Sequence, residues 1–290
     1  MLARLRSIAK EQSLPANELD QHYVMERVLY RLSQSQYRKE FVLKGAVMLR
    51  SLELPASRPT RDIDLLGLGS NEEEVIKSAF RKILALDYPE DGVVIDIDSI
   101  SLERIVEDAD YPGLRLRFTA LIGTARYVQY IDIGFGDRVH PDPVMRTLPA
   151  ILNQAPPELL CYSIESVIAE KLQAMLHLGD TNSRIKDYYD IWWLSSKQRF
   201  SGEQLAHAIS ETLKQRQTAA DPQSTAFSRD FISMRAARWM ALRERLDDPD
   251  APLEFAEVVQ LVQGFVRPLL EALKSGSGFS LHWDPPGPWR

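Results

Sequence analysis

The sequence predicts an α/β fold in two parts: a mixed sheet with helices, followed by a bundle of helices. Short runs of β-branched or alternating apolar residues fall between residues 41 and 133. A proline-rich loop is expected over residues 141–157. From Ser163 onward the apolar residues recur at helical spacing. We therefore expect one domain over residues 1–155 and a helical domain over residues 156–290.

In the first part, most of residues 1–38 is predicted to be helical. Strands are expected at residues 41–43, 62–66, 93–97, 114–121 and 127–133. Lys44-Gly45 forms a turn before a helix from Ala46 to Leu54, which Pro55 ends. Asn71 is expected to cap the next helix, because three glutamates follow it and carboxylates stabilise a helix N-terminus.

The second part is predicted to be helical almost throughout. Ser163 caps its first helix, and further helices are expected at residues 184–195, 202–217, 225–246 and 252–274. The tail from Ser275 is rich in glycine and proline, so no regular structure is expected there.

Composition excludes several classes of protein. The chain has 290 residues, of which 44% are hydrophobic and 26% are charged, so global disorder is excluded. A single cysteine, Cys161, excludes a disulfide framework and any multi-cysteine metal site. No apolar run reaches the roughly 18 residues of a membrane span, and the N-terminus lacks the apolar core of a secretory signal. A cytoplasmic protein is expected.

The net charge of −6 conceals an uneven distribution along the chain. Between Asp62 and Asp110 there are 14 acidic and 4 basic residues, whereas Arg184 to Leu246 holds 11 basic and 7 acidic residues. A basic face in the second half would suit phosphate groups, and a solvated helical surface explains the same charges equally well.

Asp62-Ile63-Asp64 is the sharpest chemical feature of the sequence. In a strand, alternate residues share a face, so both carboxylates project together about 7 Å apart at Cα. Two close carboxylates repel unless a cation lies between them, and oxygen ligands at this spacing suit Mg²⁺. Asp96-Ile97-Asp98 has the same spacing but a different neighbourhood, and we interpret it as a pair of strand-end charges.

The neighbourhood of the first pair suits a phosphate. Thr60 and Arg61 precede it with a hydroxyl and a cation, and Lys44-Gly45 stands at the start of a helix. A glycine turn at a helix N-terminus offers backbone N–H groups to an anion, and Lys44 adds a positive charge. A metal pair beside a phosphate cradle is the arrangement that nucleotide chemistry requires.

Two further positions are candidates, each with a structural alternative. Asp132 is a lone charge in an apolar strand, and it is either a third metal ligand or a buried, hydrogen-bonded structural aspartate. Lys171 falls on the apolar stripe of its helix, where lysine requires a partner. It reaches either a phosphate or a carboxylate, and as pure structure an ion pair with Asp187 or Asp190 explains it as well.

Five segments of the chain, taken in order, resemble one enzyme family. They are Phe41-Val42-Leu43-Lys44-Gly45-Ala46, Arg58-x-Thr60-x-Asp62-Ile63-Asp64, Ile131-Asp132-Ile133-Gly134-Phe135-Gly136-Asp137, Ile168-Ala169-Glu170-Lys171-Leu172 and Ser183-Arg184-Ile185-Lys186-Asp187-Tyr188-Tyr189-Asp190. Over residues 40–195 the chain looks like the nucleotidyltransferase toxins of abortive-infection systems (the AbiEii/AbiGii type, of type IV toxin–antitoxin systems). Two positions depart from the family: Ala46 replaces the second glycine of a Lys-Gly-Gly turn, and Thr60 replaces a serine.

The resemblance implies a polymerase-β-like nucleotidyltransferase fold followed by a helical domain. It also implies transfer of NMP from an NTP to an acceptor, which in some relatives is the 3′ end of tRNA, and a cognate antitoxin encoded beside the toxin. By position, Asp62 and Asp64 match the metal-binding pair, and Lys44-Gly45 matches the turn that contacts the nucleotide. Lys171 and Asp187 match the lysine and aspartate of the later motifs.

We therefore expect Mg²⁺-dependent nucleotidyl transfer, with Asp62 and Asp64 as metal ligands and Asp132 completing the set or accepting the proton. The nucleotide-binding residues expected beside them are Lys44, Gly45, Thr60, Arg61 and Lys171. Two other functions remain open: a degraded nucleotidyltransferase that only binds a partner, and a nucleotide-dependent kinase that transfers the γ-phosphoryl group.

An RNA acceptor would need cations along its backbone. Arg235, Arg238 and Arg245 fall on one side of a predicted helix at about 100° per residue, whereas Arg243 points elsewhere. These three arginines are the candidate RNA contacts, and a solvated helix face is the alternative.

Overall fold

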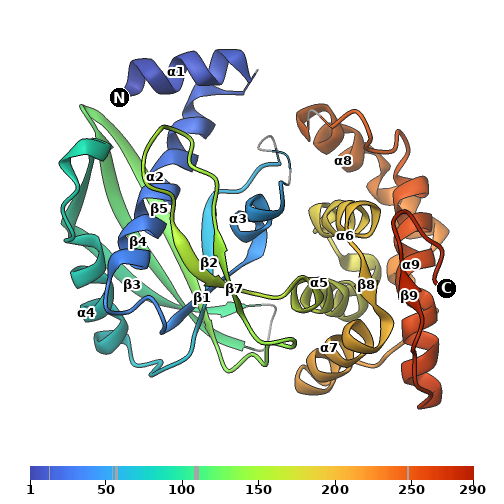
Figure 1. Ribbon diagram of the computed structural model, residues 1–290. Coiled ribbons are helices and arrows are strands. Elements are labelled where there is room, and N and C mark those ends of the chain that lie inside the picture. Colours follow the sequence, from blue (N-terminus) through green and yellow to red (C-terminus); the bar gives the residue numbers. More distant parts are fainter. Residues whose placement is uncertain (13, 54, 56–57, 108–110, 247) are drawn as a thin grey trace. The chain divides into compact units, whose positions relative to one another are not determined.

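The computed structural model describes residues 1–12, 14–53, 55, 58–107, 111–246 and 248–290, and the chain divides into two compact units (Figure 1). The N-terminal unit comprises Met1–Gly136 and Pro143–Tyr162. The C-terminal unit comprises Asp137–Asp142 and Ser163–Arg290. In the part of the chain that is described, no helix is both long and apolar enough to cross a membrane.

The N-terminal unit is built on a mixed sheet. Among the described residues seven strands form it in the order β3-β4-β5-β2-β1-β7-β6. They are β1 (Phe41–Lys44), β2 (Asp62–Gly67), β3 (Val93–Glu107), β4 (Tyr111–Ile122), β5 (Ala125–Phe135), β6 (Val144–Thr147) and β7 (Glu158–Cys161). β2 runs parallel to β5 and β1 to β7, and the other neighbouring pairs are antiparallel. The predicted mixed sheet is confirmed.

The helices of this unit are α1 (Leu2–Glu11), α2 (Ala16–Gln34), α3 (Gly45–Leu49) and α4 (Glu73–Leu84), with short 3₁₀ turns at Arg50–Leu52 and Pro89–Asp91. Three of them, α2, α3 and α4, pack against strands of the sheet, and α1 packs against α2. α2 crosses the sheet (Figure 1), where it contacts β5, β7 and α4. Tyr23, Val24 and Val28 of this helix are buried, as the predicted apolar side of the N-terminal helix requires.

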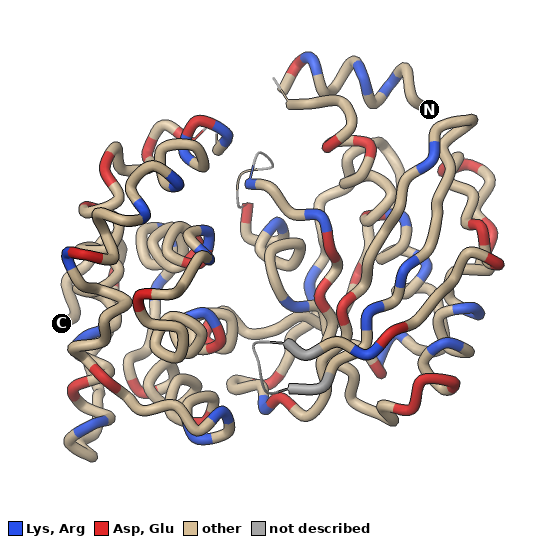
Figure 2. Tube along the Cα trace, turned by 180° about the vertical axis from the view of Figure 1, so that it is seen from behind, with Lys and Arg blue, Asp and Glu red and all other residues tan. Residues whose placement is uncertain are grey.

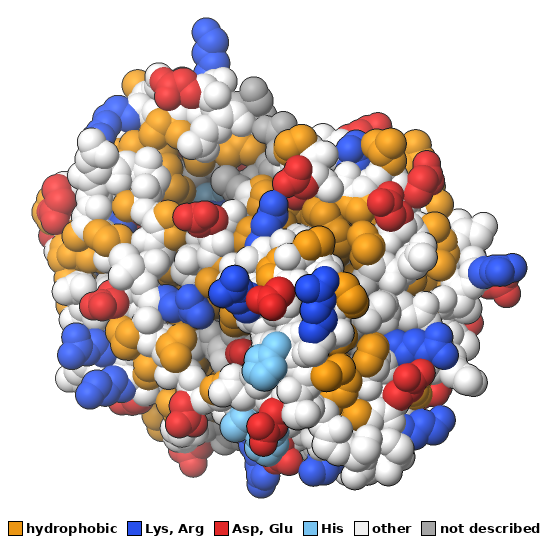
Figure 3. Space-filling view, turned by 45° about the vertical axis from the view of Figure 1, so that its right-hand side comes forward, with side chains coloured by type: hydrophobic (Ala, Val, Ile, Leu, Met, Phe, Trp, Pro, Cys, Tyr) orange, Lys and Arg blue, Asp and Glu red, His pale blue; other side chains and the backbone are white. Residues whose placement is uncertain are grey.

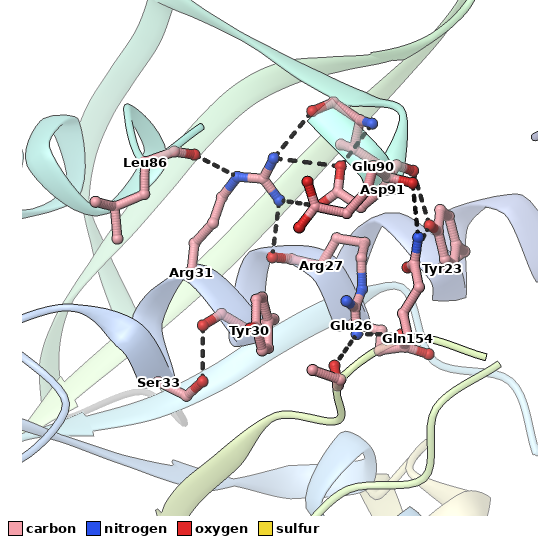
Figure 4. A network of polar contacts seen from close by, with 12 residues as sticks. Tyr23, Glu26, Arg27, Tyr30, Arg31, Ser33, Leu86, Glu90, Asp91 and Gln154 are labelled. Atoms are coloured by element: carbon pink, nitrogen blue, oxygen red, sulfur yellow. Dashed lines mark hydrogen bonds and ion pairs between the residues drawn. The ribbon is translucent and has the colours of Figure 1, made fainter. Parts of the chain in front are cut away.

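A buried polar network fixes α2 to the beginning of β3 (Figure 4). Arg31 is 1% exposed, and its Nη1 donates to Asp91 Oδ2 at 2.7 Å while its Nη2 donates to the carbonyl of Val93 at 3.0 Å. Its Nε donates to the carbonyl of Leu86 at 3.0 Å. The Tyr23 hydroxyl lies 2.7 Å from the carbonyl oxygen of Asp91. Every edge of this guanidinium is therefore matched to an acceptor, which compensates for burying its charge.

The C-terminal unit is helical, as predicted. Its helices are α5 (Ile164–Leu178), α6 (Ile185–Lys197), α7 (Gly202–Gln215), α8 (Arg229–Leu246) and α9 (Phe255–Ser275), with 3₁₀ turns at Gly179–Thr181 and Thr225–Phe227. Ser163 caps α5 as expected, since its hydroxyl accepts the backbone N–H of Ser166.

Three local predictions are wrong: the cap at Asn71, the loop at residues 141–157 and the irregular tail beyond Ser275. Asn71 does not cap α4, because the helix begins at Glu73 after Glu72, and the N–H of Glu72 already donates to the Ser70 hydroxyl. The proline-rich segment 141–157 contains a strand, β6, at the edge of the sheet. Pro143 directly precedes this strand, so it removes no hydrogen bond from the strand ladder.

The tail beyond Ser275 also has regular structure. β9 (His282–Trp283) pairs with β8 (Phe200–Ser201) in a small second sheet. Trp283 is buried, its Nε1 donates to the carbonyl of Ser195 at 2.7 Å, and its ring lies 4.8 Å from that of Phe265. Tertiary burial of one tryptophan therefore overrides the local preference of a segment rich in glycine and proline.

Candidate functional site

Asp62 and Asp64 share one face of β2, as the spacing predicts. Ile63 between them is fully buried, whereas both aspartates are half-buried. β2 pairs with β5 so that Asp62 lies opposite Tyr130 and Asp64 lies opposite Asp132. Residues directly opposite on paired strands share a face of the sheet, so Asp132 joins Asp64 on the face of the pair.

A row of charged residues crosses the sheet on this face. Lys44 of β1 is opposite Asp64, Asp64 is opposite Asp132, and Asp132 is opposite Arg115 of β4. Figure 2 shows acidic and basic positions next to one another on these middle strands. The two aspartates in the centre of the row are therefore flanked by one cation on each side.

The turn after β1 fits closely against Asp64. Gly45 has φ +69°, and a Cβ atom at this position would lie 2.0 Å from Asp64 Oδ2. Glycine is therefore required here both by the backbone conformation and by the space that the carboxylate fills. Ala46 lies inside α3 and has no positive φ. Alanine therefore adds no backbone strain at the position where the family has its second glycine. Lys44 is buried, and its Nζ lies 5.9 Å from the centre of the Tyr162 ring.

The residues that precede β2 lie next to Asp62, the first residue of the aspartate pair. The Thr60 hydroxyl is 3.5 Å from the carbonyl oxygen of Asp62, and Thr60 is half-buried. Arg61 is exposed. Arg58 is buried and donates to the carbonyl of Pro59 at 3.0 Å.

Asp132 is held by a residue that sequence reasoning missed. Arg115 Nε donates to Asp132 Oδ1 at 2.8 Å, and Arg115 Nη2 donates to Asp132 Oδ2 at 2.7 Å. These hydrogen bonds, together with the charges of Asp132, Asp62 and Glu103, raise the pKa of Arg115 above its ordinary value. Asp132 is thus an ion-paired aspartate on the same sheet face as Asp62 and Asp64. Its partner could have been found in the sequence only from the pairing of β4 with β5, which places Arg115 opposite Asp132.

The second Asp-x-Asp has a different environment. The Asp98 side chain is 96% exposed and lies 3.2 Å from Arg81, and the Asp96 side chain is 38% exposed. Both belong to β3, which is an edge strand of the sheet. Their surroundings agree with the interpretation as surface charges.

The C-terminal unit contains a second polar cluster, around Lys171 of α5. Lys171 Nζ lies 2.6 Å from Asp187 Oδ1 and 2.8 Å from Asp190 Oδ2, both on α6. Arg184 Nε donates to the other oxygen of Asp187 at 2.8 Å. All but Arg184 are buried, and Asp190 is fully buried. The structure brings together both of the carboxylates that the sequence offered as partners.

The three candidate RNA contacts on α8 differ in exposure. Arg235 is half-buried, and its Nε and Nη2 donate to the carbonyls of Asn182 and Asp180 at 2.8 Å and 3.1 Å. Arg238 and Arg245 are exposed. Figure 3 shows basic side chains interspersed with acidic and apolar ones on the face in view. Arg238 and Arg245 are therefore better placed than Arg235 to contact a ligand in solution.

The donor set of β2 fits a magnesium ion. Two carboxylates on one strand face are the hard oxygen ligands that Mg²⁺ takes alongside water and substrate phosphates. Among the described residues, no three histidine, cysteine or acidic side chains cluster as a complete metal site. Asp62 and Asp64 could hold such an ion together with phosphate oxygens of a bound substrate. Cys161 is buried, and burial raises the pKa of its thiol to about 12, so it is no candidate nucleophile.

Comparison with known families decides the assignment. Residues 27–268 match the family described as Nucleotidyl transferase AbiEii toxin, Type IV TA system. The chain belongs to this family. AbiEii membership makes it a nucleotidyltransferase toxin, and it implies an NTP substrate and a cognate antitoxin. The match extends past the five segments, from α2 into α9.

Two solved structures are similar to this AbiEii chain. A protein from Helicobacter pylori assigned as a nucleotidyltransferase is 18% identical, with 90% of this chain and 99% of that chain covered and a TM-score of 0.46. JHP933 from Helicobacter pylori is 16% identical, with 91% and 97% covered and a TM-score of 0.45. No curated protein sequence matches the chain.

Proposed function

We propose that this AbiEii toxin transfers NMP from an NTP to an RNA acceptor in a Mg²⁺-dependent reaction centred on Asp62 and Asp64. The supporting observation is the packing of Asp64 against the Gly45 turn, on the sheet face that Asp62 shares. It brings two carboxylates and a short turn with a basic residue into one place. We also propose residues 1–155 as the nucleotidyltransferase core and residues 156–290 as a helical domain.

In this mechanism Asp62 and Asp64 are the metal ligands. Bound Mg²⁺ would neutralise phosphate charge and lower the pKa of the acceptor hydroxyl. The hydroxyl oxygen attacks the α-phosphorus, and pyrophosphate leaves. Lys44 and the Gly45 backbone offset negative charge on the phosphates, and Thr60 and Arg61 line the nucleotide site. Asp132, beside Asp64 on the same face, serves as third ligand or proton acceptor.

Lys171 and Asp187 of the C-terminal unit belong to the proposed machinery because they match the later family motifs. Lys171→Met should abolish transfer per folded molecule, whereas Lys197→Met should not. Lys197 is a surface control for the loss of a lysine charge, because it forms an exposed ion pair with Asp250 at 2.9 Å. Equal transfer by both variants would remove Lys171 from the machinery.

The acceptor is proposed to be tRNA, held in part by α8. Arg238→Ala together with Arg245→Ala should weaken RNA binding with little dependence on sequence. The slope of log affinity against log salt should fall by about 0.7–0.9 for each lost phosphate contact. Adding Arg235→Ala tests the complete predicted stripe. Arg267→Ala on α9 is the control, since Arg267 pairs with Glu271 at 2.9 Å on an exposed face. An unchanged salt slope would move the RNA site to another surface.

Labelled nucleotides test the reaction itself. The purified chain is incubated with total tRNA, Mg²⁺ and each of the four NTPs in turn, labelled at either the α- or the γ-phosphorus. Nucleotidyl transfer predicts α-label in the RNA and γ-label in pyrophosphate. The γ-label in an acceptor would identify a kinase, and no transfer to RNA or to protein would favour a binding module.

A further inference from the structure

The Arg115–Asp132 ion pair lies inside the row of charges that carries the candidate metal ligands. Arg115 binds both oxygens of Asp132, at 2.8 Å and 2.7 Å, in the parallel fork geometry that makes such pairs strong. The Asp132 side chain is 11% exposed and that of Arg115 is 36% exposed. The carboxylate is therefore largely shielded from water and is compensated by one guanidinium.

On the side away from Arg115, Asp132 faces Asp64 and hence a second position that a cation could occupy. Asp64 is its direct neighbour on β2, so a cation bound at Asp62 and Asp64 would lie on the side of Asp132 opposite to Arg115. Two carboxylates side by side repel each other unless each has a cation. Arg115 supplies that cation for Asp132 and so offsets the repulsion between the two aspartates.

Arg115 itself has an alternative partner. Glu103 of β3 is its direct neighbour on the strand opposite to β5, and Glu103 is exposed. The charge of Glu103 already contributes to the raised pKa of Arg115. The guanidinium thus lies between two carboxylates on one face, and moving toward Glu103 would release the oxygens of Asp132.

We propose that Arg115 is a positioning residue that competes with the metal for Asp132. The third carboxylate joins Asp62 and Asp64 only when it exchanges the guanidinium for the metal. This inference rests on the proposed function, because it takes the Asp62–Asp64 pair as the metal site. It accounts for the absence, within the described residues, of a ready cluster of three ligands, although three aspartates share the face.

The test is the affinity of the full chain for Mn²⁺ without nucleotide, measured by electron paramagnetic resonance or calorimetry. Arg115→Ala should bind Mn²⁺ at least about tenfold more tightly, because the metal no longer competes with the two charge-assisted hydrogen bonds from Arg115 to Asp132. Arg115→Lys keeps the charge but loses the fork, and it should show an intermediate gain.

Arg117→Ala is the matched control for the general loss of a positive charge. Arg117 lies two residues further along β4 on the same face, opposite Tyr130 instead of Asp132, and it is exposed. Competition predicts a much smaller gain for Arg117→Ala than for Arg115→Ala. It also predicts that in the Asp132→Asn background Arg115→Ala increases the Mn²⁺ affinity by no more than Arg117→Ala does. Equal gains from Arg115→Ala and Arg117→Ala, or a full gain in the Asp132→Asn background, would overturn the proposal.

Two further measurements keep the outcome interpretable. Asp64→Asn should greatly weaken Mn²⁺ binding, and an unchanged affinity would contradict the proposed metal site itself, irrespective of Arg115. Thermal unfolding shows whether Arg115→Ala folds, since it leaves Asp132 without this partner. If it does not fold, the Arg115→Lys variant decides, and an Mn²⁺ affinity equal to the wild type would then overturn the proposal.

Discussion

Replacing Gly45 with alanine tests the geometry of the site most sharply among single changes. The added Cβ would lie 2.0 Å from Asp64 Oδ2, and such contacts are essentially never shorter than 3.0 Å. The carboxylate must therefore move by about 1 Å, a displacement that lowers catalytic rates by roughly 100-fold where geometry is critical. The left-handed backbone at φ +69° adds a cost of about 1–2 kcal/mol in the free energy of unfolding.

Gly123→Ala is the matched control for this variant. Gly123 has φ +61° in the turn between β4 and β5, and among the described residues other than its two chain neighbours no atom lies within 4 Å of the position of its Cβ. It should lose the same stability, measured by urea unfolding, without losing transfer of the α-label from NTP. If Gly45→Ala retained transfer within a few-fold of Gly123→Ala, the packing of the turn on Asp64 would not matter for the reaction.

Three further predictions concern stability. Arg31→Met should lower the free energy of unfolding by about 3–5 kcal/mol, because it leaves Asp91 buried without its cation; a loss below about 1 kcal/mol in urea unfolding would contradict this. Burial lowers the pKa of His22 from 6.5 to about 3, so the unfolded chain binds more protons between these values. Wild-type stability should therefore fall as pH drops from 6.5 toward 3 by up to about 1.4 kcal/mol per pH unit relative to His22→Gln, and parallel pH profiles would refute the assignment. Trp283→Ala should cost about 3–5 kcal/mol in the same assay, and a neutral result would show that the tail contributes nothing to the fold.

The strands of the site were predictable because their residues carry strong local signals. Ile63 between two aspartates fixes which face is polar, and a glycine after a lysine marks the turn at the end of β1. A charge on an apolar stripe predicted that Lys171 needs a partner, either a phosphate or a carboxylate, because a buried lysine is not left unpaired. The structure pairs it with the carboxylates of Asp187 and Asp190.

Other features depend on contacts between distant segments. Arg115 lies in a different strand from Asp132, and only strand order and register make them neighbours. The same holds for Trp283, whose partners Ser195 and Phe265 come from two helices. Local patterns predict the conformation of a segment, whereas pairing across a sheet and burial of a tail are properties of the whole fold.

In the proposed mechanism the Asp62–Asp64 pair carries the nucleotidyl transfer, and one measurement tests this role directly. The rate of α-label transfer from NTP to tRNA is compared for Asp64→Asn and Asp98→Asn, which remove the same charge from the same type of motif. Asp64→Asn should reduce transfer to background while remaining folded, and Asp98→Asn should keep the wild-type rate because its side chain is 96% exposed. Equal loss in both variants, or transfer by folded Asp64→Asn at the wild-type rate, would contradict the account.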